Sequence, residues 1–288
     1  MIRSPALALG TVQFGLAYGI AGRGEPVPEA ETRAILRRAW DLGIHRLDTA
    51  PGYGAIEERL IDLIQDLPFS IASKVGAVPF PDEAAATNYV RSSVRQSRRR
   101  LGQRLNTILF HNAEDLSGEN GRALWSAATD TAEGASLGPS CYDVETLHAI
   151  ALSLPQVVAA QLPGNAFDQA VASDPPPAKM EISLRSTFLQ GLLLMPEREA
   201  AARVPAARDA LARWHGFCAE AGLSALEAAL SVAKGLPGID FCLVGVDNQA
   251  QLEEIAGAWE RAAPLEVRWL DTPERDIIDP RRWSGSNE

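Results

Sequence analysis

The sequence predicts an α/β protein, a (β/α)8 TIM barrel in a single domain. Short β-branched or apolar runs alternate with longer segments of helical periodicity, a pattern typical of parallel strands joined by crossover helices. Eight such runs are enough to close a barrel, and α/β barrels of this length form one domain around one core. We therefore expect one domain over residues 1–288, with its core at about 6–261.

The expected strands are short and apolar. They cover residues 6–12, 45–49, 69–74, 107–111, 135–138, 157–162, 181–186 and 241–244. The expected helices keep one face apolar, as Ile35, Ala39 and Leu42 do in the first, which Gly43 ends. They cover residues 29–42, 56–65, 83–101, 143–154, 204–221, 225–235 and 248–261.

Three segments fit this pattern less well. The helical periodicity is weak at 120–131, and three consecutive prolines, Pro175 to Pro177, make 174–179 a connection that cannot continue a helix. The tail at about 267–288 is irregular and either covers the barrel or trails away.

Composition narrows the classes of function. A net charge of −10 argues against nucleic-acid binding, which needs a concentrated basic surface. The arginine run at 91–104 is interpreted as the solvated face of an outer helix, with an anionic partner site as the minority alternative. No apolar run is long enough to span a membrane, no secretory signal is evident, and three widely spaced cysteines fit a reduced cytoplasm.

Polar residues end several of the apolar strands. Asp48, Lys74, His111 and Gln161 each stand there, and each alone has an ordinary structural explanation. Because the carboxyl ends of barrel strands share one mouth, we expect these side chains to meet there, with Tyr53 five residues beyond Asp48.

These residues together suggest carbonyl chemistry. The ammonium of Lys74 is expected to stabilise the Tyr53 phenolate and lower the tyrosine pKa, while Asp48 holds Lys74 charged. His111 would donate a hydrogen bond to a substrate oxygen. No residue supplies electrons, so a cofactor must provide hydride. A Schiff-base isomerase or lyase using Lys74 is an alternative.

Several longer motifs follow one another along the chain. They are LGTVQFGLAYG, LDTAPGYG, SKVG and LFHN, followed by VVAAQLPGNAFD, RSTFLQGLL, GLSALEAAL and LVGVDNQAQLEEI. In their order and spacing these motifs resemble the aldo-keto reductase family. The resemblance implies a barrel that binds NADP(H), or less often NAD(H), without a Rossmann domain. Asp48, Tyr53, Lys74 and His111 match the catalytic tetrad of this family, with Tyr53 as general acid or base.

The resemblance also implies a set of cofactor-binding residues. Gln161 matches the residue that binds the nicotinamide carboxamide, and either Ser136 or Ser140 matches a serine of the same role. Ser186 matches a serine near the pyrophosphate, and Arg185 stands where an aromatic side chain usually stacks on the nicotinamide. The remaining candidates are Gly10 and Thr11 of the first motif, and Gly245, Val246, Asp247, Gln251 and Glu254 at the adenosine end.

The adenosine-end segment lacks the arginine or lysine of many NADPH-preferring members. Asp247 would repel a 2′-phosphate and accept hydrogen bonds from a free ribose, so both NADPH and NADH stay open. No histidine or cysteine spacing suggests a metal site. The letters GASLG at 134–138 fit a hydrolase elbow, but Pro139 follows where a helix must begin.

We therefore expect hydride transfer between NAD(P)H and an aldehyde or ketone. The segment QFGLAYGIAG resembles members associated with sugars and glycan precursors, which favours a sugar-derived carbonyl. The alternative is a cofactor-binding regulatory or scaffold protein of the same fold. The expected partner is a small carbonyl or alcohol, for a monomer or weak homo-oligomer.

Overall fold

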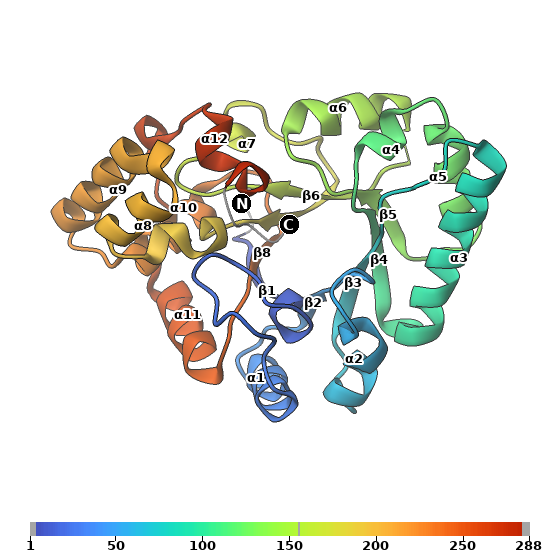
Figure 1. Cartoon of the computed structure of the whole chain (residues 1–288), viewed down its shortest axis with the longest axis horizontal. Helices are drawn as coiled ribbons and strands as arrows, with labels where there is room; N and C mark the ends of the chain where they lie inside the picture. The colour runs from blue at the N-terminus through green and yellow to red at the C-terminus, as the bar shows by residue number, and fades with distance from the viewer. Residues whose placement is uncertain (1–3, 155, 284–288) are drawn as a thin grey trace.

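The chain forms a ring of parallel strands with helices outside it (Figure 1). The computed structural model describes residues 4–154 and 156–283. Its strands are β1 (Ala6–Gly10), β2 (Arg46–Asp48), β3 (Ser70–Val75), β4 (Leu105–Phe110), β5 (Ser136–Pro139), β6 (Ala159–Pro163), β7 (Glu181–Arg185) and β8 (Phe241–Val244). All eight predicted strands are therefore present in the described residues, with ends displaced by one or two residues.

The strands pair in the order β5-β4-β3-β2-β1-β8-β7-β6, all in parallel. The ends of this sheet meet at a seam between β5 and β6, where Ser140 and Gln161 form a parallel bridge. Beside it the Cys141 amide donates to the Gln161 carbonyl at 2.8 Å. This contact closes the ring, so the predicted (β/α)8 barrel is confirmed.

The α-helices are α1 (Glu29–Asp41), α2 (Ile56–Ile64), α3 (Glu83–Leu101), α4 (Glu114–Ser117), α5 (Gly121–Thr129), α6 (Val144–Ser153), α7 (Ala170–Ser173), α8 (Glu197–Arg203), α9 (Arg208–Ala221), α10 (Ala225–Gly235), α11 (Gln249–Arg261) and α12 (Arg275–Ile278). The 3-10 turns are η1 (Val12–Phe14), η2 (Gly102–Arg104), η3 (Leu189–Leu194), η4 (Pro205–Ala207), η5 (Arg268–Leu270) and η6 (Pro280–Arg282). The helix starts use local caps. Asp82 accepts from the Ala85 amide, and Ser224 and Glu227 form a capping box.

Several elements differ from the sequence expectation. The weakly periodic segment forms the regular helix α5, because Leu124, Ala127 and Ala128 are buried together on one face. The predicted helix 204–221 is split, since Pro205 begins the separate turn η4. Four short helices, α4, α7, α8 and α12, were not predicted.

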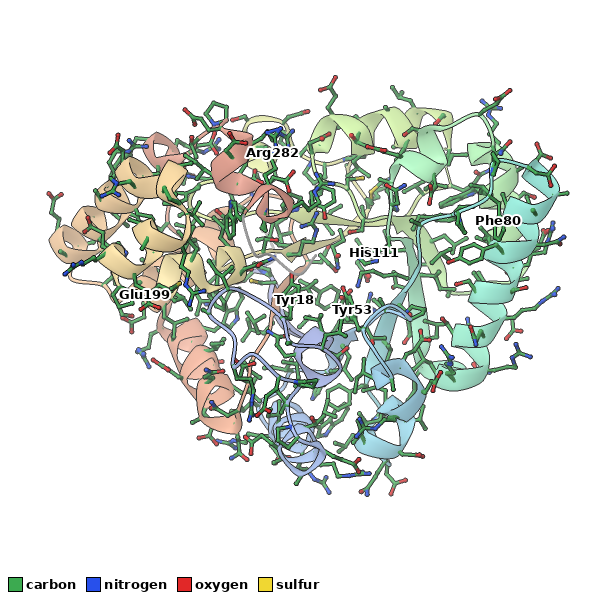
Figure 2. All side chains as sticks on the ribbon, viewed as in Figure 1. Tyr18, Tyr53, Phe80, His111, Glu199 and Arg282 are labelled. Atoms are coloured by element: carbon green, nitrogen blue, oxygen red, sulfur yellow. The ribbon has the colours of Figure 1, made fainter. Side chains whose placement is uncertain are left out.

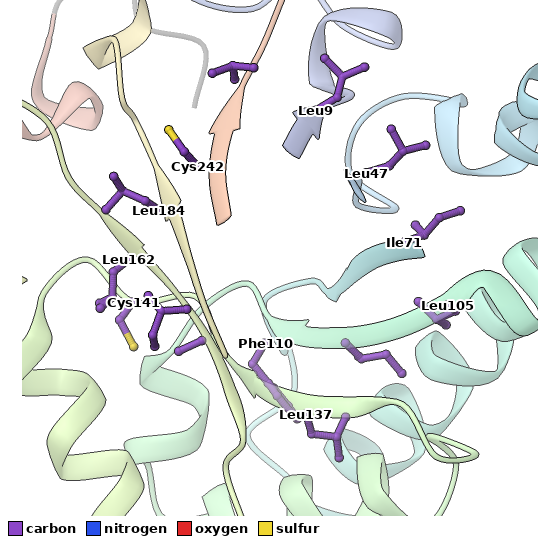
Figure 3. Packing of buried hydrophobic residues seen from close by; sticks show 14 of the residues in the cluster. Leu9, Leu47, Ile71, Leu105, Phe110, Leu137, Cys141, Leu162, Leu184 and Cys242 are labelled. Carbon is purple, nitrogen blue, oxygen red and sulfur yellow. The ribbon is translucent and has the colours of Figure 1, made fainter. Parts of the chain in front are cut away.

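Side chains of the strands alternate between two environments. Alternate residues such as Leu9, Leu47, Leu162 and Leu184 point outward and pack under the helices (Figure 3). The residues between them point into the barrel. A second apolar cluster joins α8, α9 and α10 to the tail, where Leu270, Ile277 and Trp283 are buried. The described part of the tail therefore packs with these helices.

Arg46 fills the amino end of the barrel interior. Its guanidinium donates to Ser70 at 2.8 Å, Thr107 at 2.7 Å and Glu181 at 2.9 Å, and lies 5.1 Å from the centre of the Phe241 ring. Because this layer is packed with its own polar partners, only the carboxyl end of the barrel is left for a site.

The arginine run on α3 makes contacts within the protein. Arg100 binds the buried Glu57 at 2.9 Å, Arg91 pairs with Asp130 at 3.3 Å, and Arg98 donates to the Leu105 carbonyl at 3.0 Å. These contacts tie α3 to neighbouring elements.

Candidate active site

One connected hydrogen-bond network lies at the carboxyl end of the barrel and joins Asp48, Lys74, Gln161 and Ser140. Lys74 Nζ lies 2.5 Å from Asp48 Oδ1 and 3.0 Å from the Thr49 carbonyl oxygen, and its side chain is fully buried. Gln161 Nε2 donates to Asp48 Oδ2 at 3.0 Å, and the Ser140 hydroxyl donates to Gln161 Oε1 at 3.1 Å. Strand ends far apart in sequence thus hold one buried ion pair.

Tyr53 and His111 stand beside this ion pair. Their ring centres lie 6.1 Å apart at an interplanar angle of 82°, and Lys74 Nζ is 5.0 Å from the centre of the Tyr53 ring. Figure 2 shows both residues at the centre of the ring. The structure therefore brings together the four residues that the sequence singled out.

Glycines hold the Tyr53 loop against the loop after β1. A Cβ on Gly15 would lie 1.9 Å from the Tyr53 carbonyl oxygen, and one on Gly54, whose φ is +63°, would lie 2.5 Å from the Gly15 carbonyl oxygen. Only residues without a side chain allow this approach. The glycines of the two motifs thus fix the backbone that carries Tyr53.

The Tyr53 phenol is harder to ionise than the sequence argument expected. Burial raises the pKa of Tyr53 above its usual value of 10.0, and this effect outweighs the charge of Lys74, which lowers the pKa as predicted. The negative charge of Asp48 opposes Lys74. The expected net lowering is therefore wrong for this arrangement, because burial of the phenol and the charge of Asp48 together outweigh the effect of Lys74.

Lys74 and His111 respond to the same surroundings in opposite ways. Burial lowers the pKa of Lys74, but the charges of Asp48 and Tyr53 together outweigh it and raise the pKa. For His111, burial of the ring and the charge of Lys74 lower the pKa to about 4, although the residue is exposed at the mouth. At neutral pH the site therefore holds a charged lysine and a neutral imidazole.

The structure separates the two serine candidates. Ser136 begins β5 and pairs with Thr107, in the polar layer at the amino end of the barrel. Ser140 follows β5 and is buried against Gln161. Ser136 therefore lies outside the site, because it precedes Ser140 by four residues and every two residues along a strand move a side chain by one full layer.

Gly10 and Thr11 border the ion pair. Gly10 pairs with Asp48 in register, and the Thr11 hydroxyl donates to the Asp48 carbonyl oxygen at 3.0 Å. Thr11 is buried and fixes the end of β2. A Cβ on Gly10 would lie 3.6 Å from the Val244 carbonyl oxygen, at ordinary van der Waals contact.

Ser186 and Gln190 belong to a strained loop after β7. Ser186, Leu189 and Gln190 have positive φ angles of 61°, 50° and 54°, which are costly for residues other than glycine. Both amide atoms of Gln190 are buried without a hydrogen-bond partner in the described structure. Such strain and unsatisfied polarity are typical of binding loops. Sequence reasoning missed Gln190, although it lies in the motif RSTFLQGLL.

A cavity of about 550 Å³ lies at the amino end of α11. Its lining includes Asp247 and Gln251 from the expected segment, together with Asn248, which caps α11 by accepting from the Gln251 amide. The loop after β1 adds Arg23 and Glu25, and the remaining lining residues are Ala21, Pro28 and Glu31. Sequence reasoning missed Arg23, which lies within the glycine-rich loop, and Glu31, which follows that loop.

The other adenosine-end candidates are dispersed. Gly245 abuts Gln13, whose side chain would lie 2.2 Å from a Cβ at that position. Val246 is buried in the core, and Glu254 is exposed on α11, one turn beyond Gln251. These three residues do not line the cavity.

In residues 4–154 and 156–283, no group of three or more His, Cys, Asp or Glu side chains is arranged to hold a metal ion. Within the same residues, no single helix has the length and apolarity of a membrane span. One bent pair, Pro205–Ala221 with Ala225–Gly235, meets that test by length and composition alone.

Fold and site together resemble those of (β/α)8 barrels of the aldo-keto reductase type. The model of the aldo/keto reductase family matches residues 6–121. Two solved structures of a putative aldo-keto reductase from Pseudomonas aeruginosa each cover 90% of this chain and 90% of their own, with TM-scores of 0.62 and identities of 25% and 24%.

Two curated enzymes are similar in sequence. D-threo-aldose 1-dehydrogenase from a Pseudomonas species is 26% identical, with 93% of this chain and 98% of the relative covered. Pyridoxal 4-dehydrogenase from Microbacterium luteolum is 37% identical, but the match spans only 28% of this chain and 23% of that enzyme. These findings confirm the predicted resemblance to the aldo-keto reductase family.

Proposed function

We propose that this protein transfers a hydride between a nicotinamide cofactor and an aldehyde or ketone. The observation that carries the proposal is the buried pair of Lys74 and Asp48, 2.5 Å apart, beside the Tyr53 phenol. A structural ion pair needs no tyrosine and no neutral histidine next to it at an open barrel mouth.

Each residue has a defined part in this reaction. When bound, the nicotinamide supplies the hydride that adds to the carbonyl carbon. Tyr53 gives its phenolic proton to the developing alkoxide, and Lys74 stabilises the phenolate that remains. Asp48 keeps Lys74 charged, and neutral His111 donates a hydrogen bond to the carbonyl oxygen. A raised pKa keeps Tyr53 loaded with its proton, which suits the reductive direction.

The polar groups around the mouth fit such a cofactor. Ser140 and Gln161 present a hydroxyl and an amide at the ion pair, where a carboxamide would be held. The buried, unpartnered amide of Gln190 offers both a donor and an acceptor, and the cavity at α11 supplies the second end of the site. Schiff-base chemistry at Lys74 is disfavoured because its ammonium is held charged by Asp48.

The charges of the cavity favour NAD(H) over NADP(H). Three carboxylates, Glu25, Glu31 and Asp247, line it against the single guanidinium of Arg23, which pairs with Glu25 at 2.8 Å. Burial raises the pKa of Asp247, whereas Arg23 lowers it. Carboxylates accept hydrogen bonds from a free 2′-hydroxyl and repel a 2′-phosphate. Side-by-side titration of protein fluorescence with NADH and NADPH tests this preference, and tighter binding of NADPH would overturn it.

The substrate class rests on the relatives. One curated relative is named for an aldose and another for pyridoxal. Both compounds are polar and carry an aldehyde group. We therefore propose a sugar or sugar-derived carbonyl as substrate, for a monomer or weak homo-oligomer in the cytoplasm. The three cysteines, all buried and unpaired, fit that location.

The deciding experiment is Tyr53→Phe, with Tyr89→Phe on α3 as the matched control. Turnover of an aldose panel should fall by about 100-fold to 10,000-fold in Tyr53→Phe, as expected for loss of a general acid, while cofactor affinity is retained. The control should keep its turnover. Cofactor binding without turnover in the wild type would favour the regulatory alternative, and retained turnover in Tyr53→Phe would exclude Tyr53 as the acid.

A further inference from the structure

Arg185 lies on the inner face of the barrel at its open end. In the register of β6 and β7, Gln161 pairs with Ser183 and Pro163 with Arg185. Gln161 points inward to Asp48, so Ser183 and Arg185 point inward as well, because residues two apart share a face. Arg185 is thus one layer beyond the catalytic network, on the side from which a substrate enters.

The guanidinium of Arg185 rests on an aromatic ring. Its Cζ lies 4.2 Å from the centre of the Tyr142 ring, and Arg281 Cζ lies 3.4 Å from the same centre. Arg185 also donates to the Cys141 carbonyl oxygen at 3.2 Å and to the Ser186 hydroxyl at 3.3 Å. These hydrogen bonds are long and their acceptors are neutral. They leave the other N–H donors of the Arg185 guanidinium available.

The other cations around the mouth are matched by carboxylates. Lys74 is paired with Asp48, and Arg281 binds Asp279 through two hydrogen bonds of 2.9 and 2.7 Å. Among the described residues no carboxylate forms an ion pair with Arg185. The charge of Arg185 lowers the pKa of the buried Asp168, but the two side chains form no ion pair. Arg185 therefore carries the unmatched positive charge of this mouth.

We propose that Arg185 binds an anionic group of the substrate, a carboxylate or a phosphate, a short distance from the carbonyl that Tyr53 protonates. This inference rests on the proposed reductase function and narrows its substrate class. A half-buried guanidinium with free donors is the side chain best suited to a planar or tetrahedral anion. The charge of Arg185 also lowers the pKa values of Tyr53 and His111, so it lies within electrostatic reach of both.

Matched substrates test the proposal. Succinic semialdehyde is compared with butanal, and glyceraldehyde 3-phosphate with glyceraldehyde, in the wild type and in Arg185→Gln, Arg185→Lys and the surface control Arg213→Gln. The readout is the ratio of kcat/KM for the charged member of each pair to that of the neutral member. Removing one charge-assisted contact should lower this ratio by about 10-fold to 100-fold in Arg185→Gln. Arg185→Lys should keep most of the ratio, and Arg213→Gln all of it.

A binding arm separates this inference from the proposed function. Calorimetry of succinate against neutral succinamide, with cofactor-loaded protein, should show selective succinate binding that Arg185→Gln abolishes. Selective binding without turnover of any aldehyde would overturn the reductase function alone. Turnover of neutral aldehydes without any preference for anions would overturn the inference alone. If Arg185→Gln weakens cofactor binding more than 10-fold and leaves the ratio unchanged, Arg185 binds the cofactor diphosphate and the inference is wrong.

Discussion

Gln161 reaches across the barrel and donates a hydrogen bond from Nε2 to Oδ2 of Asp48 at 3.0 Å. Lys74 occupies the other carboxylate oxygen, so Asp48 is held on both sides, and Ser140 fixes the orientation of the Gln161 amide. The residues proposed to handle the proton are thereby coupled to the amide proposed to hold the cofactor. A substitution in the Lys74–Asp48 pair should therefore alter cofactor binding, and a substitution of Gln161 should alter turnover.

Replacing Asp48 with Asn should be costly, because it leaves the Lys74 ammonium buried without its counter-charge. We expect a loss of about 3–5 kcal/mol in the free energy of unfolding, together with near-complete loss of turnover. The double variant Asp48→Leu with Lys74→Met should regain most of the stability and none of the activity. Urea unfolding measures the stability of the single and the double variant. Equal destabilisation of the two variants would contradict this account.

The pH dependence of carbonyl reduction should be flat across neutral pH. His111, with its pKa lowered to about 4, stays neutral above pH 5, and Tyr53, with its pKa raised above 10.0, stays protonated. The rate should therefore fall only at the acid and alkaline extremes. A profile of kcat/KM measured from pH 5 to 10 checks this, and an inflection near 6.5 would show that His111 titrates normally.

The meeting of Asp48, Tyr53, Lys74 and His111 at one mouth was predictable from the sequence, because each of these residues ends a strand or follows one closely. Parallel strands bring their carboxyl ends together whatever the details of packing. Arg23 and Gln190 were not predictable, since they lie on loops whose paths depend on long-range contacts. The pKa of Tyr53 was predicted with the wrong sign, because neither its burial nor the opposing charge of Asp48 can be weighed without coordinates.

Asp168 should make stability depend on pH. Burial raises its pKa from 3.8 to about 6, with Asp271 raising it further and Arg185 and Arg275 lowering it. Since the folded-state pKa lies above the unfolded value, the ionised form opposes folding. Stability should therefore fall as the pH rises from about 4 through 6 and level off above it, by about 2–3 kcal/mol in all.

Asp168→Asn tests that dependence, because the amide keeps an oxygen acceptor and loses the charge. The variant should be more stable than the wild type at pH 8 and nearly equal to it at pH 4. Urea unfolding at the two pH values, with a second Asp→Asn change at the exposed Asp66 as control, measures the difference. A variant less stable than the wild type at pH 8 would mean that the carboxylate is needed for its charge.

Gly138 should be indispensable at the seam that closes the barrel. A Cβ there would lie 1.6 Å from the Ala159 carbonyl oxygen, which belongs to the backbone of β6 and cannot move aside cheaply. Gly138→Ala must therefore push β5 away from β6, next to the bridge between Ser140 and Gln161. We expect a loss of at least about 3 kcal/mol in stability, and weaker cofactor binding because the Gln161 amide is displaced.

Gly216→Ala is the matched control for this change. Gly216 lies within α9, and a Cβ there would meet nothing within 4 Å, so alanine should stabilise the helix by up to about 1 kcal/mol. Thermal unfolding of the two variants should shift in opposite directions. If Gly138→Ala unfolded at the same temperature as the wild type, β5 and β6 would have to lie farther apart than described. If the variant also bound cofactor as tightly as the wild type, the position of the Gln161 amide would not depend on the seam.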